Sequence, residues 1–258
     1  MSIPSVASLV QVSVIMPVYN EQDRIVQCIQ STRANLETLG MRYEIIVVDD
    51  GSTDGTRTEA MRVARNPYVK VLGYEGNRGK GFAVKLGTKH AAGDVVVLID
   101  GDAEVRPGII GQYVRVLEQN DVAIGSKWHP ESRVSAPFLR KLLSHGFHCL
   151  VMLLTGVTVS DTQSGLKAFR REKLAKIMSL LSVKRYAFDV EMLAVARLLK
   201  MRIIELPIEI ELRGAFSVRQ VVRMFIDLLG IAYRLRIIRW YQRSLDNVYA
   251  AYRPIIRW

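Results

Sequence analysis

The stretch VVVLIDGD, residues 95–102, indicates the fold of this chain most directly. Its first five residues are apolar and mostly β-branched, as in a strand covered on both faces of a sheet, and an aspartate pair follows at once. Three earlier apolar runs alternate with segments of helical spacing, which predicts parallel strand–helix–strand units in an open α/β sheet. The expected strands are 12–16, 44–48, 69–72 and 95–99, and the expected helices are 21–39, 54–65 and 80–92.

The length and composition are those of one large globular domain, or of one domain with a short appendage. The chain has 258 residues, of which 49% are hydrophobic, and a formal net charge of +11. A chain of this length buries roughly three quarters of its unfolded surface, so intrinsic disorder and a disulfide scaffold are both excluded. Cys28 and Cys149 lie in apolar stretches without metal-ligand or redox spacing, and we expect both to be reduced core residues.

The positive charge is concentrated near the C-terminus. Residues 213–258 hold nine arginines and two aspartates, a net charge of +7, with aromatic residues between them. Such a segment suits an anionic surface, either a membrane or a nucleic acid. The most apolar stretch, 142–159, is close to the minimum spanning length of about 18 residues and contains two histidines, which favours a buried or interfacial helix. The N-terminus lacks the features of a signal peptide, so export is not expected.

Polar residues follow three of the predicted strands at the point where each strand ends. In open α/β sheets, ligands bind outside the carboxyl ends of the strands, so these residues are the first candidates for a site. The residues that follow the first, second and fourth strands include Pro17, Tyr19, Glu21, Asp49, Asp50, Asp100, Asp102 and Glu104.

Asp100 and Asp102 form the strongest candidate for a metal site. Two carboxylates this close repel each other unless a cation compensates them. Mg²⁺ binds through one or two carboxylates together with substrate phosphate oxygens, and Glu104 is near enough to help directly or through water. The alternative is a solvated turn that precedes a helix beginning near Pro107.

Two further loops suggest a nucleotide site. Asp49 and Asp50 could accept hydrogen bonds from a base or ribose, although the same loop could serve only to begin a helix. Tyr19 could pack on a base, in a turn fixed by Pro17. The loop GNRGKG, residues 76–81, has the glycines and the lysine of a phosphate cradle at a helix N-terminus, but not the spacing of a Walker A motif. We expect it to lie near the diphosphate or to shape the donor site.

The motifs PVYNE (17–21), DDGSTDGT (49–56), NRGKG (77–81) and DGD (100–102), in this order, resemble those of family 2 glycosyltransferases with the GT-A fold. The segments DTQSGLKAFR (161–170), FDVEML (188–193) and ELPI (205–208) are similar to the dolichyl- or polyprenyl-phosphate β-glycosyltransferases, and closer to the glucosyl than to the mannosyl branch. The resemblance covers roughly residues 12–243. It implies a Rossmann-like, mostly parallel sheet flanked by helices in a catalytic domain, 1–212, followed by a basic amphipathic membrane-associating segment, 213–258.

The resemblance implies an inverting, metal-dependent transfer of a hexose to dolichyl or polyprenyl phosphate. Glucose from UDP-glucose is favoured, GDP-mannose is next, and the cofactor is Mg²⁺ or Mn²⁺. The product is a polyprenyl-phosphate β-sugar for glycan or protein glycosylation. The enzyme would work as a peripheral protein on an anionic membrane at the cytoplasmic face, with residues 213–243 as an interfacial helix. Because the acceptor phosphate is already an anion, no strong general base is required.

The resemblance also implies roles for individual residues. Those that bind the donor nucleotide are Pro17, Tyr19, Glu21, Asp49, Asp50, Gly79, Lys80, Asp100, Gly101, Asp102, Lys127, Arg213 and Arg219. The metal would be held by Asp100, Asp102 and Glu104. The acceptor phosphate would be held by Lys127, Arg140, Ser144 and Arg213. The catalytic set is Asp100, Asp102, Arg140 and Arg213.

Three acidic residues are candidates for a base or for the acceptor site, namely Asp161, Asp189 and Glu191. For two of them a structural role is the alternative, in which Asp161 orders its loop and Glu191 pairs with a nearby arginine. Two other functions stay open at this point. One is transfer to a hydroxyl acceptor of a glycolipid or surface polysaccharide. The other, a non-enzymatic nucleic-acid-binding protein, is disfavoured by the intact carboxylates, so nucleic acid is not an expected partner. The sequence does not determine the oligomeric state.

Overall fold

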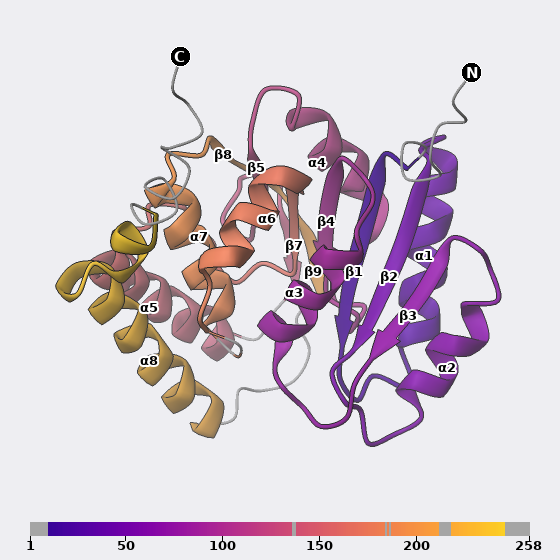
Figure 1. Cartoon of the computed structure of the whole chain (residues 1–258), viewed down its shortest axis with the longest axis horizontal. Helices are drawn as coiled ribbons and strands as arrows, with labels where there is room; N and C mark the ends of the chain where they lie inside the picture. Colours follow the sequence, from indigo (N-terminus) through magenta and orange to yellow (C-terminus); the bar gives the residue numbers. More distant parts are fainter. Residues whose placement is uncertain (1–9, 136–137, 184, 186, 212–217, 246–258) are drawn as a thin grey trace, which may run out of the picture.

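A seven-stranded sheet forms the centre of the protein in a computed structural model (Figure 1). The structure describes residues 10–135, 138–183, 185, 187–211 and 218–245, and it describes no side chain within 138–143 or 218–220. The strands of this sheet are β1 (Val12–Val18), β2 (Tyr43–Asp49), β3 (Val69–Gly73), β4 (Val95–Ile99), β5 (Val122–Ser126), β7 (Leu166–Arg170) and β8 (Ile203–Pro207).

The strand order is β3-β2-β1-β4-β7-β5-β8. Only β7 runs antiparallel to its neighbours β4 and β5, and the other pairings are parallel. The mostly parallel α/β sheet that the sequence predicts is therefore confirmed, and all four predicted strands are present. The second sheet is small and pairs β6 (Arg133–Ser135) with β9 (Glu209–Glu211).

Helices cover both faces of the central sheet, as the apolar character of its strands requires. Successive residues of β1 alternate between the faces, since Ile15 belongs to one buried cluster and Val14 and Met16 belong to the other. The first face packs against α3 (Lys80–His90), α6 (Arg171–Leu180), α7 (Phe188–Leu198) and part of α8 (Val218–Ala232). The second packs against α1 (Ile25–Thr38), α2 (Thr56–Val63), η2 (Pro107–Ile109) and α4 (Ile110–Val116).

Two expectations about the second half of the chain are corrected. Cys28 is buried, but Cys149 is exposed on α5 (Phe138–Thr155), so only one of the two free cysteines is a core residue. The helix expected over residues 213–243 is not continuous in its described part: α8 runs into η3 (Tyr233–Ile237), and Arg239, with a φ of 49°, then turns the backbone. The turn brings Tyr241 back into the core, where its side chain is fully buried.

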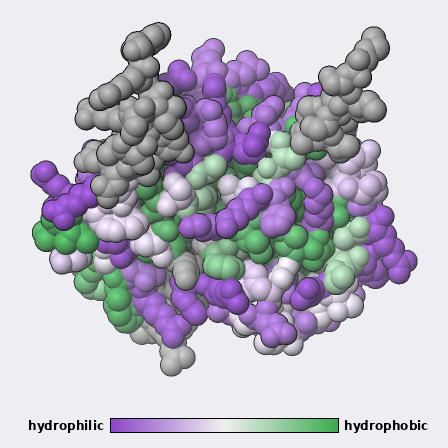
Figure 2. Space-filling model, in the orientation of Figure 1, coloured by the Kyte–Doolittle hydropathy of each residue, from purple (hydrophilic) through white to green (hydrophobic). Residues whose placement is uncertain are grey.

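Helices α5 and α8 contact each other and leave apolar side chains in solvent. In Figure 2 hydrophobic residues gather along the left edge, over α8 and η3. We call this surface the α5–α8 face; its exposed residues are Leu150, Met152, Leu153, Val221, Val222, Phe225, Ile226, Leu229, Tyr233 and Ile237. Exposed arginines accompany it at positions 223, 236 and 239. Neither helix could span a membrane, and no other helix within the described residues is both long and apolar enough to do so.

Candidate functional site

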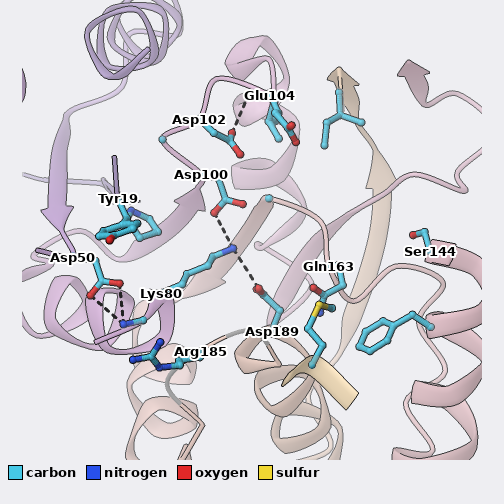
Figure 3. A pocket seen from close by; sticks show the side chains of 18 of the residues that line it. Tyr19, Asp50, Lys80, Asp100, Asp102, Glu104, Ser144, Gln163, Arg185 and Asp189 are labelled. Atoms are coloured by element: carbon cyan, nitrogen blue, oxygen red, sulfur yellow. Dashed lines mark hydrogen bonds and ion pairs between the residues drawn. The ribbon is translucent and has the colours of Figure 1, made fainter. Parts of the chain in front are cut away.

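A pocket of about 1130 Å³ opens at the carboxyl ends of β1, β2 and β4 and extends between α5 and α8. The side chains that line it come from both halves of the chain (Figure 3). The lining includes most of the site residues expected from the sequence: Pro17, Tyr19, Glu21, Asp50, Gly79, Lys80, Asp100, Gly101, Asp102, Glu104, Lys127, Ser144 and Asp189. Three expected residues, Asp49, Asp161 and Glu191, are not part of the lining, and Arg140, Arg213 and Arg219 lie outside the residues whose side chains are described.

The DGD turn places two carboxylates at the pocket wall directly after β4. Asp102 accepts a hydrogen bond from the backbone N–H of Glu104 (3.0 Å), and Ala103 takes a φ of 56° to close the turn. Burial, followed by the negative charge of Asp100, raises the pKa of Asp102 to about 7. The turn therefore holds acidic groups whose mutual repulsion a cation would relieve.

The donor atoms of this turn suit Mg²⁺ or Mn²⁺, which prefer hard oxygen ligands and leave positions for water and substrate phosphate. A direct ligand role of Glu104 beside these two carboxylates is not supported, and a role through water stays a prediction. Within the described part of the chain, no three acidic, histidine or cysteine side chains lie close enough together to hold a metal ion. The carboxylates of Asp100 and Asp102 would thus be the two protein ligands, and the donor phosphates would complete the coordination sphere.

The ammonium group of Lys80 lies beside the DGD turn, between two carboxylates (Figure 3). Its Nζ is 2.8 Å from Asp100 Oδ1 and 3.2 Å from Asp189 Oδ2. The other oxygen of Asp189 is 2.8 Å from Nζ of Lys167, a fully buried lysine. Although burial raises the pKa of Asp189, the two ammonium groups outweigh it and lower that pKa below its usual range. Asp189 is thus an ionised counter-ion and a poor proton acceptor.

The glycine-rich loop before α3 binds a carboxylate of the protein itself. Asp50 accepts hydrogen bonds from the N–H groups of Arg78 (2.7 Å) and Gly79 (2.8 Å) and from the hydroxyl of Tyr74 (2.7 Å). Gly79 adopts a φ of 97°, a conformation that L side chains rarely adopt, which explains the glycine at this position. The N–H groups of Arg78 and Gly79 are therefore occupied by Asp50, which suits the expected role of this loop in shaping the site, while its role near a donor diphosphate stays a prediction. Asp50 shapes the loop as well as lining the pocket.

Asp49 is buried and accepts a hydrogen bond from the N–H of Ser52 (3.1 Å), so it orders the turn after β2. Asp54 similarly accepts from the N–H of Thr56 (2.9 Å) at the start of α2, which confirms the alternative that part of this acidic loop begins a helix.

Asp161 and Lys127 form a buried ion pair behind the pocket wall. The Nζ of Lys127 is 2.7 Å from Asp161 Oδ2, and the N–H groups of Lys127 (3.1 Å) and Gln163 (3.0 Å) also donate to Asp161. These contacts confirm the alternative in which Asp161 orders its loop. Lys127 also lines the pocket, and its positive charge is paired there with the Asp161 carboxylate.

Glu191 is fully buried on α7 and joins three segments of the chain. It accepts hydrogen bonds from the N–H groups of Ser182 (3.1 Å) and Val183 (2.7 Å) and from the hydroxyl of Tyr241. Arg234 Nη2 lies 3.5 Å away, so the alternative of pairing with an arginine is confirmed. Glu191 therefore fastens the C-terminal segment to α7 and does not face the pocket.

The sequence interpretation missed several lining residues. Arg185, just before α7, donates to the carbonyl of Asn77 (3.4 Å) and faces the donor side of the pocket. Gln163 belongs to the DTQSGLKAFR motif, and its Nε2 is buried without a hydrogen-bond partner among the described residues. The apolar end of the lining is formed by Phe147, Leu150, Val221, Met224 and Phe225. No local signal distinguishes these residues from ordinary helix residues before α5, α7 and α8 are assembled.

Gly101 provides a test of the DGD geometry. A Cβ at this position would lie 2.2 Å from Cγ1 of Val18, so we expect Gly101→Ala to displace the turn and the two carboxylates. The expected cost in unfolding free energy is about 1–3 kcal/mol, the usual range for overpacking, and binding of a nucleotide in the presence of Mn²⁺ should fall with it. Thermal unfolding and calorimetric titration would measure both effects. Gly108→Ala is the control, because a Cβ there meets nothing within 4 Å; an equal effect of both variants would contradict the prediction.

Comparisons with known proteins give a consistent family and fold. The family model described as Glycosyl transferase family 2 matches residues 13–178. A dolichyl-phosphate beta-glucosyltransferase of Trichomonas vaginalis is 34% identical over 246 residues, which is 88% of this chain and 75% of the relative. The human protein of the same name is 34% identical over 244 residues, covering 87% and 75% of the two chains.

Among solved structures, the chain is similar to glucosyl-3-phosphoglycerate synthase from Mycobacterium tuberculosis in complex with Mn²⁺, UDP and glucosyl-3-phosphoglycerate. The TM-score is 0.68 at 20% identity, over 88% of this chain and 80% of that one. Mannosyl-3-phosphoglycerate synthase from Rubrobacter xylanophilus gives a TM-score of 0.66 at 20% identity, over 90% and 76%. At this identity the likeness concerns the fold, and it confirms the GT-A arrangement that the motifs predict.

Proposed function

Because the chain belongs to glycosyl transferase family 2 and is therefore a glycosyltransferase, we propose that it transfers glucose from UDP-glucose to dolichyl phosphate. The product is dolichyl-phosphate β-glucose. The names of the relatives supply the sugar and the acceptor of this proposal, and their matches extend over most of the chain.

The observation that carries the proposal is a single pocket with two chemically different ends. One end holds the carboxylates of Asp100 and Asp102, and the other lies between α5 and α8 and is lined by apolar side chains. A nucleotide diphosphate suits the first end. A phosphate carried on an isoprenoid chain suits the second end, because the chain can lie between α5 and α8 while its phosphate reaches the sugar.

A divalent cation held by Asp100 and Asp102 would neutralise the charge that develops on the leaving diphosphate. Tyr19 and Glu21, at the end of β1, are placed to contact the nucleoside, and Lys80 supplies a positive charge beside the diphosphate position. Asp161, Asp189 and Glu191 are each paired with a cation, which suits an acceptor that needs no base. A direct in-line displacement inverts the anomeric centre, so an α-linked donor gives a β-linked product.

The acceptor phosphate requires cations at the junction of the two ends. Lys127 and Ser144 line this part of the pocket. Arg140 and Arg213 complete the proposed set, and Arg140 belongs to α5, one of the helices that flank the apolar end. Arg219, on α8, is proposed to bind the donor nucleotide. Guanidinium groups suit phosphate oxygens because they can donate two parallel hydrogen bonds.

The α5–α8 face is proposed to rest on an anionic membrane, where the acceptor is dissolved. Its exposed aliphatic and aromatic residues are accompanied by arginines, the combination expected of an interfacial surface. The pocket opens between the same two helices, so this orientation brings its apolar end to the lipid. Within this arrangement residues 1–212 form the catalytic domain and residues 213–258 the membrane-associating segment. The proposed location is the cytoplasmic face, because nucleotide sugars are made in the cytosol.

The proposal is tested with radiolabelled nucleotide sugars and dolichyl phosphate in detergent, with and without EDTA. We expect UDP-glucose to label the lipid, the label to be released by mild acid, and EDTA to abolish labelling. Labelling from GDP-mannose instead would contradict the sugar assignment. Metal-dependent donor hydrolysis without any labelled lipid would contradict the acceptor assignment and favour transfer to a hydroxyl group.

A further inference from the structure

Four charged side chains form a row of alternating sign that ends at the DGD turn. Lys167, Asp189, Lys80 and Asp100 follow one another with separations of 2.8, 3.2 and 2.8 Å. The dashed lines in Figure 3 mark the last two of these contacts. The row connects β7 and α7 to α3 and to the end of β4, four elements that are well separated in the sequence.

The inner half of the row is buried and paired on both sides. The side chain of Lys167 is 1% exposed, and its Nζ also donates to the carbonyl of Ser164. Asp189 is 7% exposed, and each of its carboxylate oxygens binds one ammonium group. Moving Asp189 would leave the buried ammonium group of Lys167 without this carboxylate, which is strongly unfavourable. Asp189 therefore stays at its position whatever binds in the pocket.

The outer half of the row is able to rearrange. Lys80 is 29% exposed, lines the pocket and divides its ammonium group between Asp100 and Asp189. The oxygen that it contacts, Oδ1 of Asp100, belongs to one of the two carboxylates that suit a divalent cation. A cation and the Lys80 ammonium thus compete for Asp100, while Asp189 offers Lys80 a second partner at a similar distance.

We infer that Lys80 is a displaceable counter-ion of Asp100 and that Asp189, fixed by Lys167, is the positioning residue that retains Lys80 when a divalent cation takes Asp100. The inference rests on the proposed function in one respect, the binding of a divalent cation at the DGD turn. In this inference Lys167 and Asp189 support the replacement of Lys80 by a divalent cation at Asp100. Neither residue takes part in proton transfer or in acceptor binding.

The test is Mn²⁺ binding to the nucleotide-free protein, followed by the electron paramagnetic resonance signal of free Mn²⁺. Lys80→Met removes the competitor, so we expect Mn²⁺ to bind about tenfold more tightly, the lower end of the effect of one charge at this distance. Asp189→Asn leaves Lys80 with Asp100 as its sole anionic partner in this row, so Mn²⁺ should bind several-fold more weakly. A merely structural role of Lys80 would make the first variant bind more weakly as well.

The double variant Lys167→Met/Asp189→Asn separates stability from positioning. It removes both members of a buried pair, so it should unfold at a higher temperature than Asp189→Asn alone, yet its Mn²⁺ affinity should stay as low. Glu44→Gln is the matched control. Glu44 is a buried carboxylate 2.7 Å from Lys70, and it lies outside the pocket lining, so this variant should lose stability without a change in Mn²⁺ affinity.

The inference is overturned if Lys80→Met binds Mn²⁺ no more tightly than the unchanged protein, if Asp189→Asn retains full affinity, or if the unchanged protein binds no Mn²⁺. None of these measurements uses an acceptor or a sugar. A wrong acceptor assignment would therefore show in the labelling experiment and leave this test unaffected.

Discussion

Replacing Asp102 with asparagine is expected to lower glucosyl transfer about a thousandfold, with little loss of stability. The side chain keeps its shape and can still accept from the N–H of Glu104, the contact of 3.0 Å that closes the DGD turn. Removing its charge weakens the cation site, and stabilisation of a departing diphosphate by a bound cation is worth several kcal/mol. The carboxylate is therefore needed for charge and not for folding. The measurement is the initial rate of lipid labelling from UDP-glucose over a range of Mn²⁺ concentrations, with thermal unfolding in parallel.

Asp94→Asn is the control for this experiment. Asp94 immediately precedes β4, the strand that Asp102 follows, and it is exposed, with a distant ion pair of 3.7 Å to Arg171. It should retain full activity. If Asp102→Asn kept more than a tenth of the rate at every Mn²⁺ concentration, the assignment of the DGD turn as the metal site would be wrong.

The second large effect concerns the α5–α8 face. Leu153 and Ile226 are 69% and 61% exposed, so changing both to aspartate should leave the core undisturbed. Burying an exposed aliphatic side chain is worth about 1.5–3 kcal/mol, and aspartate adds repulsion from anionic lipid. We therefore expect binding to anionic vesicles to fall about a hundredfold or more. Co-sedimentation with vesicles that contain dolichyl phosphate measures it, and lipid labelling in the same vesicles should fall in parallel.

Met61→Asp serves as the matched control, because Met61 is 57% exposed on α2, on the opposite side of the molecule (Figure 1). Its vesicle binding should be unchanged. Unchanged binding of the Leu153/Ile226 variant would instead indicate a helix pair docked on the domain with a solvated surface. If the variant bound vesicles fully but no longer labelled the lipid, the α5–α8 face would contact the isoprenoid chain of the acceptor and not the membrane.

Much of the fold could be predicted because its signal is local. The strands β1, β2 and β4 are short, mostly apolar runs. Residues that interrupt a buried strand follow them, such as Asp50 after β2 and Asp100 after β4. The break after η3 could not be predicted, because it depends on the positive φ of Arg239 and on the space that Tyr241 fills in the core. The helical spacing of apolar residues in 213–243 indicates neither the positive φ of Arg239 nor the burial of Tyr241.

In the candidate site, too, some features could be predicted from the sequence and others could not. The identity of the acidic residues at the DGD turn follows from their position directly after a strand. Their partners do not, because Lys80, Asp189 and Lys167 come from three elements that meet only in the folded chain. The glycine-rich loop is an example: it has the composition of a phosphate cradle, but Asp50, at another strand end, accepts from the N–H groups of Arg78 and Gly79.

The sequence alone determined the α/β sheet, the edge at which the pocket lies and the carboxylates of the DGD turn that line it, since all three depend on the order of residues along single strands. The tertiary structure alone decided which charges neutralise one another. Asp161, Asp189 and Glu191 are equally plausible bases in the sequence, yet each is paired with a cation from a distant segment. A buried carboxylate is stable only where folding supplies a counter-ion or hydrogen-bond donors, and that supply depends on how β5, α3 and the segment after α8 pack around it.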